Sequence, residues 1–211
     1  MPRPVLLVGG APRVPIDAVR CLVASASGAT ALALAQLLAA RGRRADLLLA
    51  GDAQPQAAAW ARYGTRQELE ARLAAWIAEH PDGAVVMSAA VNDYELAGVE
   101  WRRGAAAGSL AGNEKLPSGC DEVLIRLRPA GKLIDRLRDL GLRGPIVGFK
   151  YEAAATVLAS AAALRARVGA ACVAANSLCG RVHALVDAEG SEPCADRRQF
   201  LERLAARIAA L

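Results

Sequence analysis

The sequence predicts an α/β fold, a single doubly wound, Rossmann-like domain with a mainly parallel central sheet. Apolar runs of strand length alternate with segments of helical periodicity, which is typical of strands joined by crossover helices. Several of these runs end in glycine-rich or polar turns. The chain has 211 residues, of which 54% are hydrophobic but only 4% aromatic, so we expect one compact unit over residues 1–211 with an aliphatic core.

In the first part of the chain, each expected element ends at a recognisable boundary. Glycines follow the first two strands and the first helix, and the second helix carries an apolar stripe of Leu69, Leu73, Trp76 and Ile77. The expected elements are a strand over 4–8, a helix over 29–41, a strand over 45–50, a helix over 66–79 and a strand over 84–87.

In the second part, the alternation is interrupted once. Between residues 95 and 120 the pattern disappears, and the glycines and charges there predict a long mobile flap. The elements expected after it are a strand over 122–127, a helix over 132–140, a strand over 145–149, a helix over 153–168, a strand over 171–175, an edge hairpin that includes 182–186, and a helix over 195–211.

Composition excludes several classes of function. The formal net charge of +5 suits anionic ligands, but the arginines are scattered rather than gathered with aromatic residues, which argues against nucleic-acid binding. No apolar run reaches the roughly 20 residues that cross a bilayer, and the start of the chain lacks the features of a secretory signal. The five cysteines form no Cys-x-x-Cys pair and are expected to be reduced. We therefore expect a cytoplasmic protein without membrane contact.

Four strand ends converge on a predicted nucleotide site. Gly9 and Gly10 follow the first strand, and polar or glycine-rich segments follow the strands that end near 87, 149 and 175. Ligands of doubly wound sheets bind at the carboxyl ends of the strands. Ser27 and Gly28 open the first helix, where free N–H groups attract phosphate, although Ser27 as a simple N-cap fits the spacing equally well. A Gly-x-Gly-x-x-Gly fingerprint is absent after the first strand, which argues against a dinucleotide enzyme.

Five segments, in order along nearly the whole chain, resemble the phosphopantothenoylcysteine synthetase family, particularly its stand-alone bacterial members. The family's opening pattern is Gly-x-Thr-x-Glu-Pro-Ile-Asp-x-Val-Arg followed by Asn-x-Ser-Ser-Gly, and later patterns include Ser-Ala-Ala-Val-x-Asp-Tyr and Val-Gly-Phe-Lys-x-Glu. The matching segments are residues 10–20 with 25–28, 87–94, 113–118, 147–152 and 173–176.

The resemblance implies a ligase of coenzyme A biosynthesis. Such enzymes let 4′-phosphopantothenate attack the α-phosphorus of CTP or ATP, release pyrophosphate, and pass the acyl group to cysteine, with Mg²⁺ neutralising the triphosphate. Lys115, on the flap, and Asp93 would be catalytic; Lys115 could also be an ordinary solvated lysine. No protein ligand of a metal is assigned. The residues that would bind the nucleotide are Gly9, Gly10, Ser27, Gly28, Ala89, Lys132, Phe149, Lys150 and Asn176.

The chain departs from the family pattern in the half of the site that handles the acyl group. Ala24 stands where the family has the Asn that contacts the acyl-nucleotide, and Ala26, Ala31, Pro12, Val14 and Ser177 replace other motif residues. Losing one positioned donor typically costs about 2.7–4 kcal/mol of transition-state stabilisation. A changed acyl substrate or a weakened activity therefore follows from the sequence.

Three functional hypotheses remain. The first is a phosphopantothenate–cysteine ligase, a homodimer as the resemblance implies, without the flavin-binding decarboxylase half and hence without FMN. The second is a diverged paralogue that joins a different carboxylic acid and amine. The third is a nucleotide-binding protein without turnover. The sequence does not decide between CTP and ATP.

Overall fold

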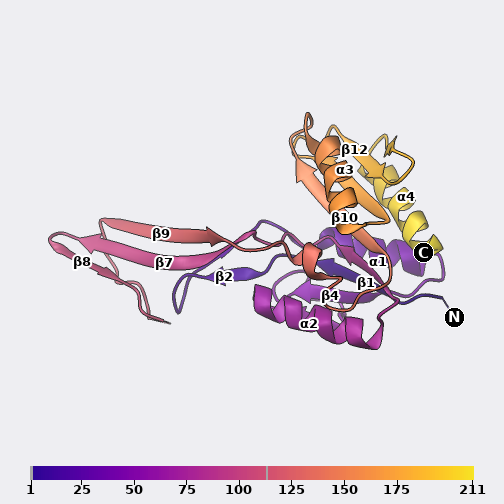
Figure 1. The fold of residues 1–211 in the computed structure, drawn as a ribbon. Helices are drawn as coiled ribbons and strands as arrows, with labels where there is room; N and C mark the ends of the chain where they lie inside the picture. The colour runs from indigo at the N-terminus through magenta and orange to yellow at the C-terminus, as the bar shows by residue number, and fades with distance from the viewer. Residues whose placement is uncertain (1, 113) are drawn as a thin grey trace.

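The computed structural model describes residues 2–112 and 114–211, and its centre is an eight-stranded sheet (Figure 1). Six strands lie parallel, and β12 and β13 form the antiparallel edge hairpin that the sequence predicts. The order across the sheet is β13 (Ser191–Pro193), β12 (His183–Val186), β11 (Cys172–Ser177), β10 (Ile146–Glu152), β6 (Ala84–Met87), β1 (Val5–Gly9), β4 (Asp46–Ala50) and β5 (Ala61–Tyr63). The predicted α/β fold with a mainly parallel sheet is confirmed.

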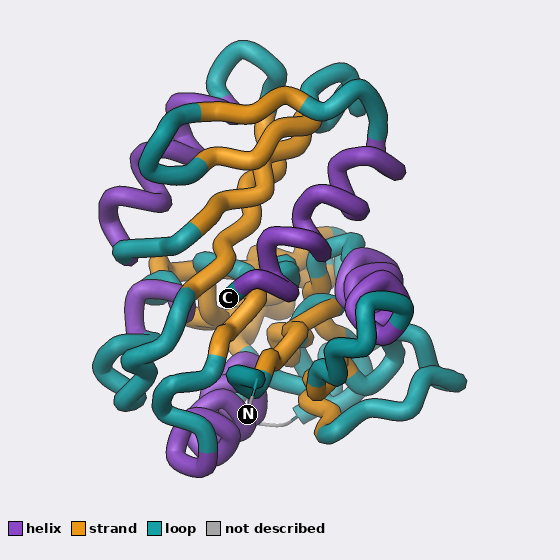
Figure 2. The backbone as a smooth tube through the Cα atoms, turned by 90° about the vertical axis from the view of Figure 1, so that its right-hand side faces the viewer, coloured by secondary structure: helices purple, strands orange, loops and turns teal. Residues whose placement is uncertain are grey.

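Helices cover both faces of this sheet, which gives the molecule three layers (Figure 2). On one face, α1 (Ala29–Ala39) and α4 (Arg197–Ala210) pack Leu34 and Phe200 against β1 and its neighbours. On the other face lie α2 (Arg66–Glu79), the short 3₁₀ helix η1 (Leu133–Arg136) and α3 (Val157–Val168), with Trp76 fully buried. The two aliphatic cores hold the strand ends in fixed positions.

The direction of winding reverses at β1. From β1 the chain passes through α1 to β4 on one side, and later strands β6, β10 and β11 are added on the other side. Ligands of such sheets bind where the order reverses, outside the carboxyl ends of the strands. This point lies between the ends of β1 and β6, next to the start of α1.

A separate three-stranded antiparallel sheet projects from the main one as an arm (Figure 1). It consists of β7 (Tyr94–Arg103), β8 (Ala106–Ser109) and β9 (Glu122–Pro129). A two-stranded hairpin, β2 (Arg13–Pro15) and β3 (Cys21–Val23), lies at its base. No helix among the described residues has the length and apolarity needed to cross a membrane.

The structure corrects three sequence-based expectations. Residues 95–120 were expected to lack regular structure, but β7 and β8 lie there, because cross-strand pairing supplies an order that local periodicity does not reveal. The strand expected over 122–127 belongs to the arm rather than to the central sheet. The helix expected over 132–140 is only the single 3₁₀ turn η1, followed by hydrogen-bonded turns. The remaining predicted helices and strands are present, with ends shifted by a few residues.

Candidate functional site

A cavity of about 420 Å³ lies at the point where the sheet reverses, and we call it the strand-end cavity. It is bounded by the turn after β1, the start of α1, the turn after β6, and the ends of β10 and β11. Ligand sites of proteins are commonly about 300–1,000 Å³ in volume. Six residues of the sequence-predicted site line it: Gly10, Ser27, Gly28, Ala89, Phe149 and Asn176.

The turn after β1 is packed so tightly that only glycine fits. Gly10 has a φ of +89°, and a Cβ on it would lie 2.6 Å from the Cβ of Ala50. A Cβ on Gly9 would lie 2.7 Å from the Cβ of Ala31. Gly9 itself lies beneath the cavity rather than among its lining residues. The backbone of this turn can therefore approach a ligand closely.

The turn after β6 is fastened to the end of β1. The Ser88 hydroxyl donates to the carbonyl of Val8 at 2.7 Å, and the Ala90 N–H donates to the carbonyl of Gly10 at 2.9 Å. Ala89 and Ala90 consequently form a small-residue wall of the strand-end cavity.

The start of α1 faces the cavity with its first N–H groups. Gly28, in left-handed conformation with φ +73°, is the N-cap, and no side chain caps the helix. The Ser27 hydroxyl accepts from the Ala29 N–H at 3.4 Å, a long contact. Ser27 is therefore not the N-cap, and the helix start offers N–H groups and the positive end of its dipole to an anion.

A loop behind these glycines, residues 51–57, is held by one arginine. Arg62 donates to the carbonyls of Ala53 and Ala57, both at 2.9 Å, and to that of Gln54 at 3.0 Å. The same loop contacts the segment before α1, because the Gln54 side chain donates to the Ser27 carbonyl at 3.3 Å. The loop behind the glycines is thus tied to β5.

The buried hydroxyl of Tyr63 supports the floor of the cavity. It donates to the carbonyl of Gly9 at 2.9 Å. Burial, followed by the charge of Asp52, raises the pKa of Tyr63, so the phenol stays protonated and keeps its donor role.

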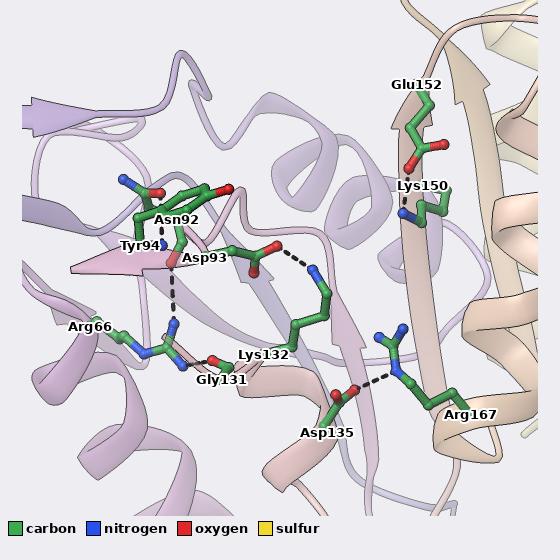
Figure 3. Close-up of polar contacts among 10 residues, drawn as sticks. All are labelled: Arg66, Asn92, Asp93, Tyr94, Gly131, Lys132, Asp135, Lys150, Glu152 and Arg167. Atoms are coloured by element: carbon green, nitrogen blue, oxygen red, sulfur yellow. Dashed lines mark hydrogen bonds and ion pairs between the residues drawn. The ribbon is translucent and has the colours of Figure 1, made fainter. Parts of the chain in front are cut away.

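A second cavity of about 190 Å³, the side cavity, adjoins the first and shares Ala89, Ala90 and Phe149 with it. Asp93, Lys132 and Lys150 line it, and Asp93 and Lys132 form an ion pair across it (Figure 3). The structure therefore brings these three predicted residues together at a neighbouring subsite rather than at the helix start.

Further ion pairs and hydrogen bonds lie near the side cavity (Figure 3). Arg167 donates to Asp135 at 3.0 Å, and Arg66 donates to the backbone carbonyls of Asn92 and Gly131. Lys150 donates to Glu152 at 2.5 Å, and this bond, with a smaller contribution from Ser160, lowers the pKa of Glu152. The side cavity thus combines apolar side chains such as Phe149 and Leu164 with charged groups that are already paired, which suits a base or ribose more than a free phosphate.

The flap segment around Lys115 is anchored to the turn between β2 and β3 and lines neither cavity. Asp17, in the turn between β2 and β3, is buried, and its carboxylate accepts from the Leu116 N–H at 3.0 Å. Its other donors are the Val19 and Arg20 N–H groups and the Arg20 guanidinium. Burial alone would raise the pKa of Asp17, but these hydrogen bonds and the Arg20 charge outweigh it and lower the pKa to about 2.

Lys115 is exposed and lines neither cavity, so its catalytic role stays a prediction. Asn113, which belongs to the same motif, lies outside the described residues.

No cluster of three or more metal-ligating side chains occurs within residues 2–112 and 114–211. Asp93 is a single carboxylate and is already paired with Lys132. Mg²⁺ is commonly held by one or two carboxylates together with substrate phosphates. The residues present therefore fit an ion that arrives on a triphosphate, not one held by the protein alone.

Among the residues that line the strand-end cavity and that sequence reasoning missed are Thr30, Tyr151 and Arg197. Tyr151 follows the matched Phe149 and Lys150 and is 60% exposed. Arg197 follows Asp196, the N-cap of α4, but it precedes a second arginine, Arg198, and nothing in the sequence distinguishes the two.

An exposed cysteine, Cys179, lies just beyond β11. Hydrogen bonds with Arg181 and then Ser177 lower the pKa of its thiol to about 6.

Comparisons with known proteins agree with this fold. The family model described as the DNA/pantothenate metabolism flavoprotein C-terminal domain matches residues 2–191. No curated protein matches the sequence.

Three solved structures share the fold at 16% sequence identity. The DNA/pantothenate metabolism flavoprotein from Streptococcus pneumoniae superposes with a TM-score of 0.81, covering 100% of this chain and 99% of its own. A mutant of Cab2 in complex with phosphopantothenate-cysteine has a TM-score of 0.74, covering 99% and 85%. The C-terminal domain of the coenzyme A biosynthesis bifunctional protein CoaBC has a TM-score of 0.69, covering 99% and 92%.

Proposed function

Because this chain belongs to the family of DNA/pantothenate metabolism flavoprotein C-terminal domains, that of phosphopantothenoylcysteine synthetase, we propose that it is a nucleotide-dependent amide ligase of coenzyme A biosynthesis. Its substrates would be 4′-phosphopantothenate, cysteine and CTP or ATP. The observation that carries the proposal is the strand-end cavity, where six residues of the family motifs converge from five segments of the chain.

In the proposed reaction, the substrate carboxylate attacks the α-phosphorus, and the bond from that phosphorus to the bridging oxygen breaks, releasing pyrophosphate. The cysteine amine then attacks the acyl carbon, loses a proton to solvent and releases the nucleoside monophosphate. The N–H groups at the start of α1 and the backbone at Gly10 would hold the phosphates. The side cavity, with Phe149 and Asp93, would hold the base and ribose.

Lys115 would supply positive charge to the α-phosphate, where negative charge increases as the carboxylate attacks. Mg²⁺, bound to the triphosphate, would neutralise the phosphate oxygens. Asp93 is the one lining carboxylate of the side cavity and would orient the nucleotide or this ion.

A second candidate, a paralogue that joins a different acid and amine, is favoured by Ala24. This residue follows β3 directly and precedes Ser25 and Ala26, which line the strand-end cavity. A methyl group cannot donate a hydrogen bond to an acyl carbonyl, so the second half of the reaction would be slow or would use another acceptor.

The deciding experiment is mass spectrometry of reactions that contain Mg²⁺, CTP or ATP, 4′-phosphopantothenate and cysteine. Pyrophosphate together with the amide product supports the ligase. An acyl-nucleotide that cysteine fails to consume supports the paralogue. If neither pyrophosphate nor acyl-nucleotide forms with either nucleotide, the ligase proposal is wrong and a protein without turnover remains.

The substitution Ala24→Asn tests the acyl half directly. If the missing amide limits the second step, restoring it should accelerate consumption of the acyl-nucleotide by about 10²–10³-fold, the usual value of one positioned donor. Formation of the acyl-nucleotide should change little. An equal effect on both steps would argue against this assignment.

We further propose that the chain is a homodimer joined through its arms. Strand β9 leaves Val123, Leu124, Ile125 and Leu127 between 37% and 47% exposed. Exposed apolar strands of this kind usually pair with another surface. Sedimentation analysis should show a dimer that Leu124→Glu dissociates; a monomeric wild-type protein would exclude it.

In a dimer, Lys115 could act at the cavity of the partner subunit, since it does not line the cavities of its own chain. Lys115→Ala and Asn176→Ala, each expected to be inactive, can be mixed after partial unfolding and refolding. Recovered activity would show that the flap serves the partner's cavity, because the mixed dimer has one complete site. Failure to recover would show that the flap moves to its own cavity.

A further inference from the structure

One cation of the strand-end cavity comes from outside the family motifs. Arg197 is the first residue of α4, near the end of the chain, and it lines the cavity together with Ser27 and Gly28. Its guanidinium donates to the Thr30 hydroxyl in the first turn of α1 at 3.1 Å. Two helices that are distant in sequence thus meet at the start of α1.

Arg197 differs from the other arginines of α4 in its partners. Arg198 pairs with Glu202 at 3.0 Å, Arg203 pairs with Glu192, and Arg207 pairs with Asp187 and Glu192. Among the residues that the structure describes, no carboxylate lies within ion-pair distance of Arg197. Its charge is therefore not neutralised by the protein, and most of its five N–H donors remain available.

The neighbourhood of Arg197 suits an anion with several oxygens. The start of α1, next to Thr30, has no side-chain cap and presents N–H groups. A planar guanidinium binds two oxygens of a phosphate at once, which an ammonium group cannot do. Thr30, which accepts a hydrogen bond from Arg197, directs the guanidinium toward this helix start.

We propose that Arg197 binds the β- and γ-phosphates of the nucleoside triphosphate, and the pyrophosphate after it is released, with Thr30 as its positioning residue. This inference rests on the proposed function and adds to it a contact with the leaving group. Arg197 therefore distinguishes a triphosphate from a monophosphate, because only the triphosphate reaches it.

Calorimetric titration with pyrophosphate, CTP and CMP tests the proposal without turnover. Arg197→Ala should weaken binding of pyrophosphate and CTP about tenfold or more, the usual effect of a hydrogen bond to a charged group, and should change CMP binding less than about twofold. Arg197→Lys should recover only part of the affinity. Arg198→Ala is the matched control and should bind all three ligands as the wild type does.

Thr30→Val should weaken pyrophosphate binding less than Arg197→Ala does, because the guanidinium remains but is less well directed. Circular dichroism melting of each variant identifies any that fails to fold, and Arg197→Lys then carries the test. Equal pyrophosphate binding by the wild type and folded Arg197 variants would overturn this inference alone. A wild-type protein that binds neither pyrophosphate nor CTP would refute the phosphate site itself, and the inference with it.

Discussion

The strand-end cavity and the arm are stabilised in different ways. Around the cavity, small residues are packed against each other with no spare room, as at Gly9, Gly10 and Ala31. In the arm, strands β7 and β9 pair by backbone hydrogen bonds and by exposed ion pairs such as Arg126 with Glu100 and Arg128 with Glu95. A buried carboxylate, that of Asp17, links the flap to the β2–β3 hairpin.

This difference predicts how each region responds to substitution. The cavity depends on volume, so adding one methyl group there should be more harmful than removing a charge from the arm. The arm depends on hydrogen bonds and charges in contact with water, where single pairs contribute little. Asp17 is the exception, because its charge is buried and satisfied by several donors.

The largest loss of stability is expected at the cavity, from the substitution Gly10→Ala. The new methyl group would lie 2.6 Å from Ala50 Cβ and 2.9 Å from Ala53 Cβ, and the residue would keep a φ of +89°. Overpacking and an unfavourable φ each cost about 1–3 kcal/mol, so urea denaturation should show a loss of several kcal/mol.

Gly42→Ala is the matched control for this prediction. Gly42 also has a positive φ, +70°, but no atom lies within 4 Å of its would-be Cβ. Only the conformational cost of about 1–2 kcal/mol applies there. Equal losses for the two variants would show that packing around Gly10 is looser than the structure indicates.

The next largest effect is expected in the flap, where the substitution Asp17→Asn should make the segment around Lys115 more accessible to protease. An amide can accept with only one of its two polar atoms. If its nitrogen replaces Oδ2, it presents N–H groups to the Leu116 N–H and the Arg20 guanidinium, which both donate to Oδ2, so the flap should detach more often. Endoproteinase Lys-C has three cleavage sites in this chain, Lys115, Lys132 and Lys150. We expect cleavage after Lys115 to become several-fold faster.

Lys132 and Lys150 are internal controls for the digestion. Both are ion-paired beside the side cavity, away from Asp17. If all three sites became equally sensitive, the substitution would have destabilised the whole domain, and the proposed local role of Asp17 would be wrong.

Acid should release the same contact in the unmodified protein. The pKa of Asp17 is lowered in the folded state to about 2, so the stabilisation by its carboxylate is complete above about pH 4 and is lost as the pH falls through about 2. The amide resonance of Leu116 should follow this titration by NMR. A Leu116 shift with a midpoint near the usual value of an aspartate would contradict the hydrogen bonds that the Asp17 carboxylate accepts.

The smallest effect is expected from Glu100→Gln on the arm. Its bonds from Arg126 lower the pKa of Glu100, but both side chains are largely exposed, and water replaces much of what the pair provides. The melting temperature should therefore be unchanged within error, at low and at high salt. A clearly lower melting temperature at low salt alone would show that ion pairs stabilise the arm more than we expect.

Sequence patterns correctly predicted the helices and strands whose apolar residues repeat at regular spacing and are buried in the core. The central strands β1 and β6 are buried and apolar. Helix α2, predicted over 66–79, has those bounds because Thr65 and Glu68 form a capping box and Leu69, Leu73 and Trp76 face the core. The glycine turns and the polar strand ends also indicated where the cavity lies.

The arm was not predicted as a separate sheet: the strand expected over 122–127 was assigned to the central sheet, although β9 is exposed at every position, and β7 and β8 were not expected. Strands β2 and β3 are only three residues long, and Pro15 ends one of them. Arg197 could not be selected either, since its contact with Thr30 joins residues that are 167 positions apart. These features depend on contacts between residues that are distant in sequence, which local sequence patterns do not reveal.

The carbonyl contacts of Arg62 have a consequence for how a ligand binds. Loop 51–57 carries Ala53, which packs behind Gly10 and Gly28, and Arg62 holds this loop in the structure without a ligand. The packing behind the glycine turn is therefore already formed, and a nucleotide that binds there should not lose affinity to the ordering of this loop. Affinity at this end of the site should depend on how slowly the phosphates dissociate rather than on a rearrangement that precedes their arrival.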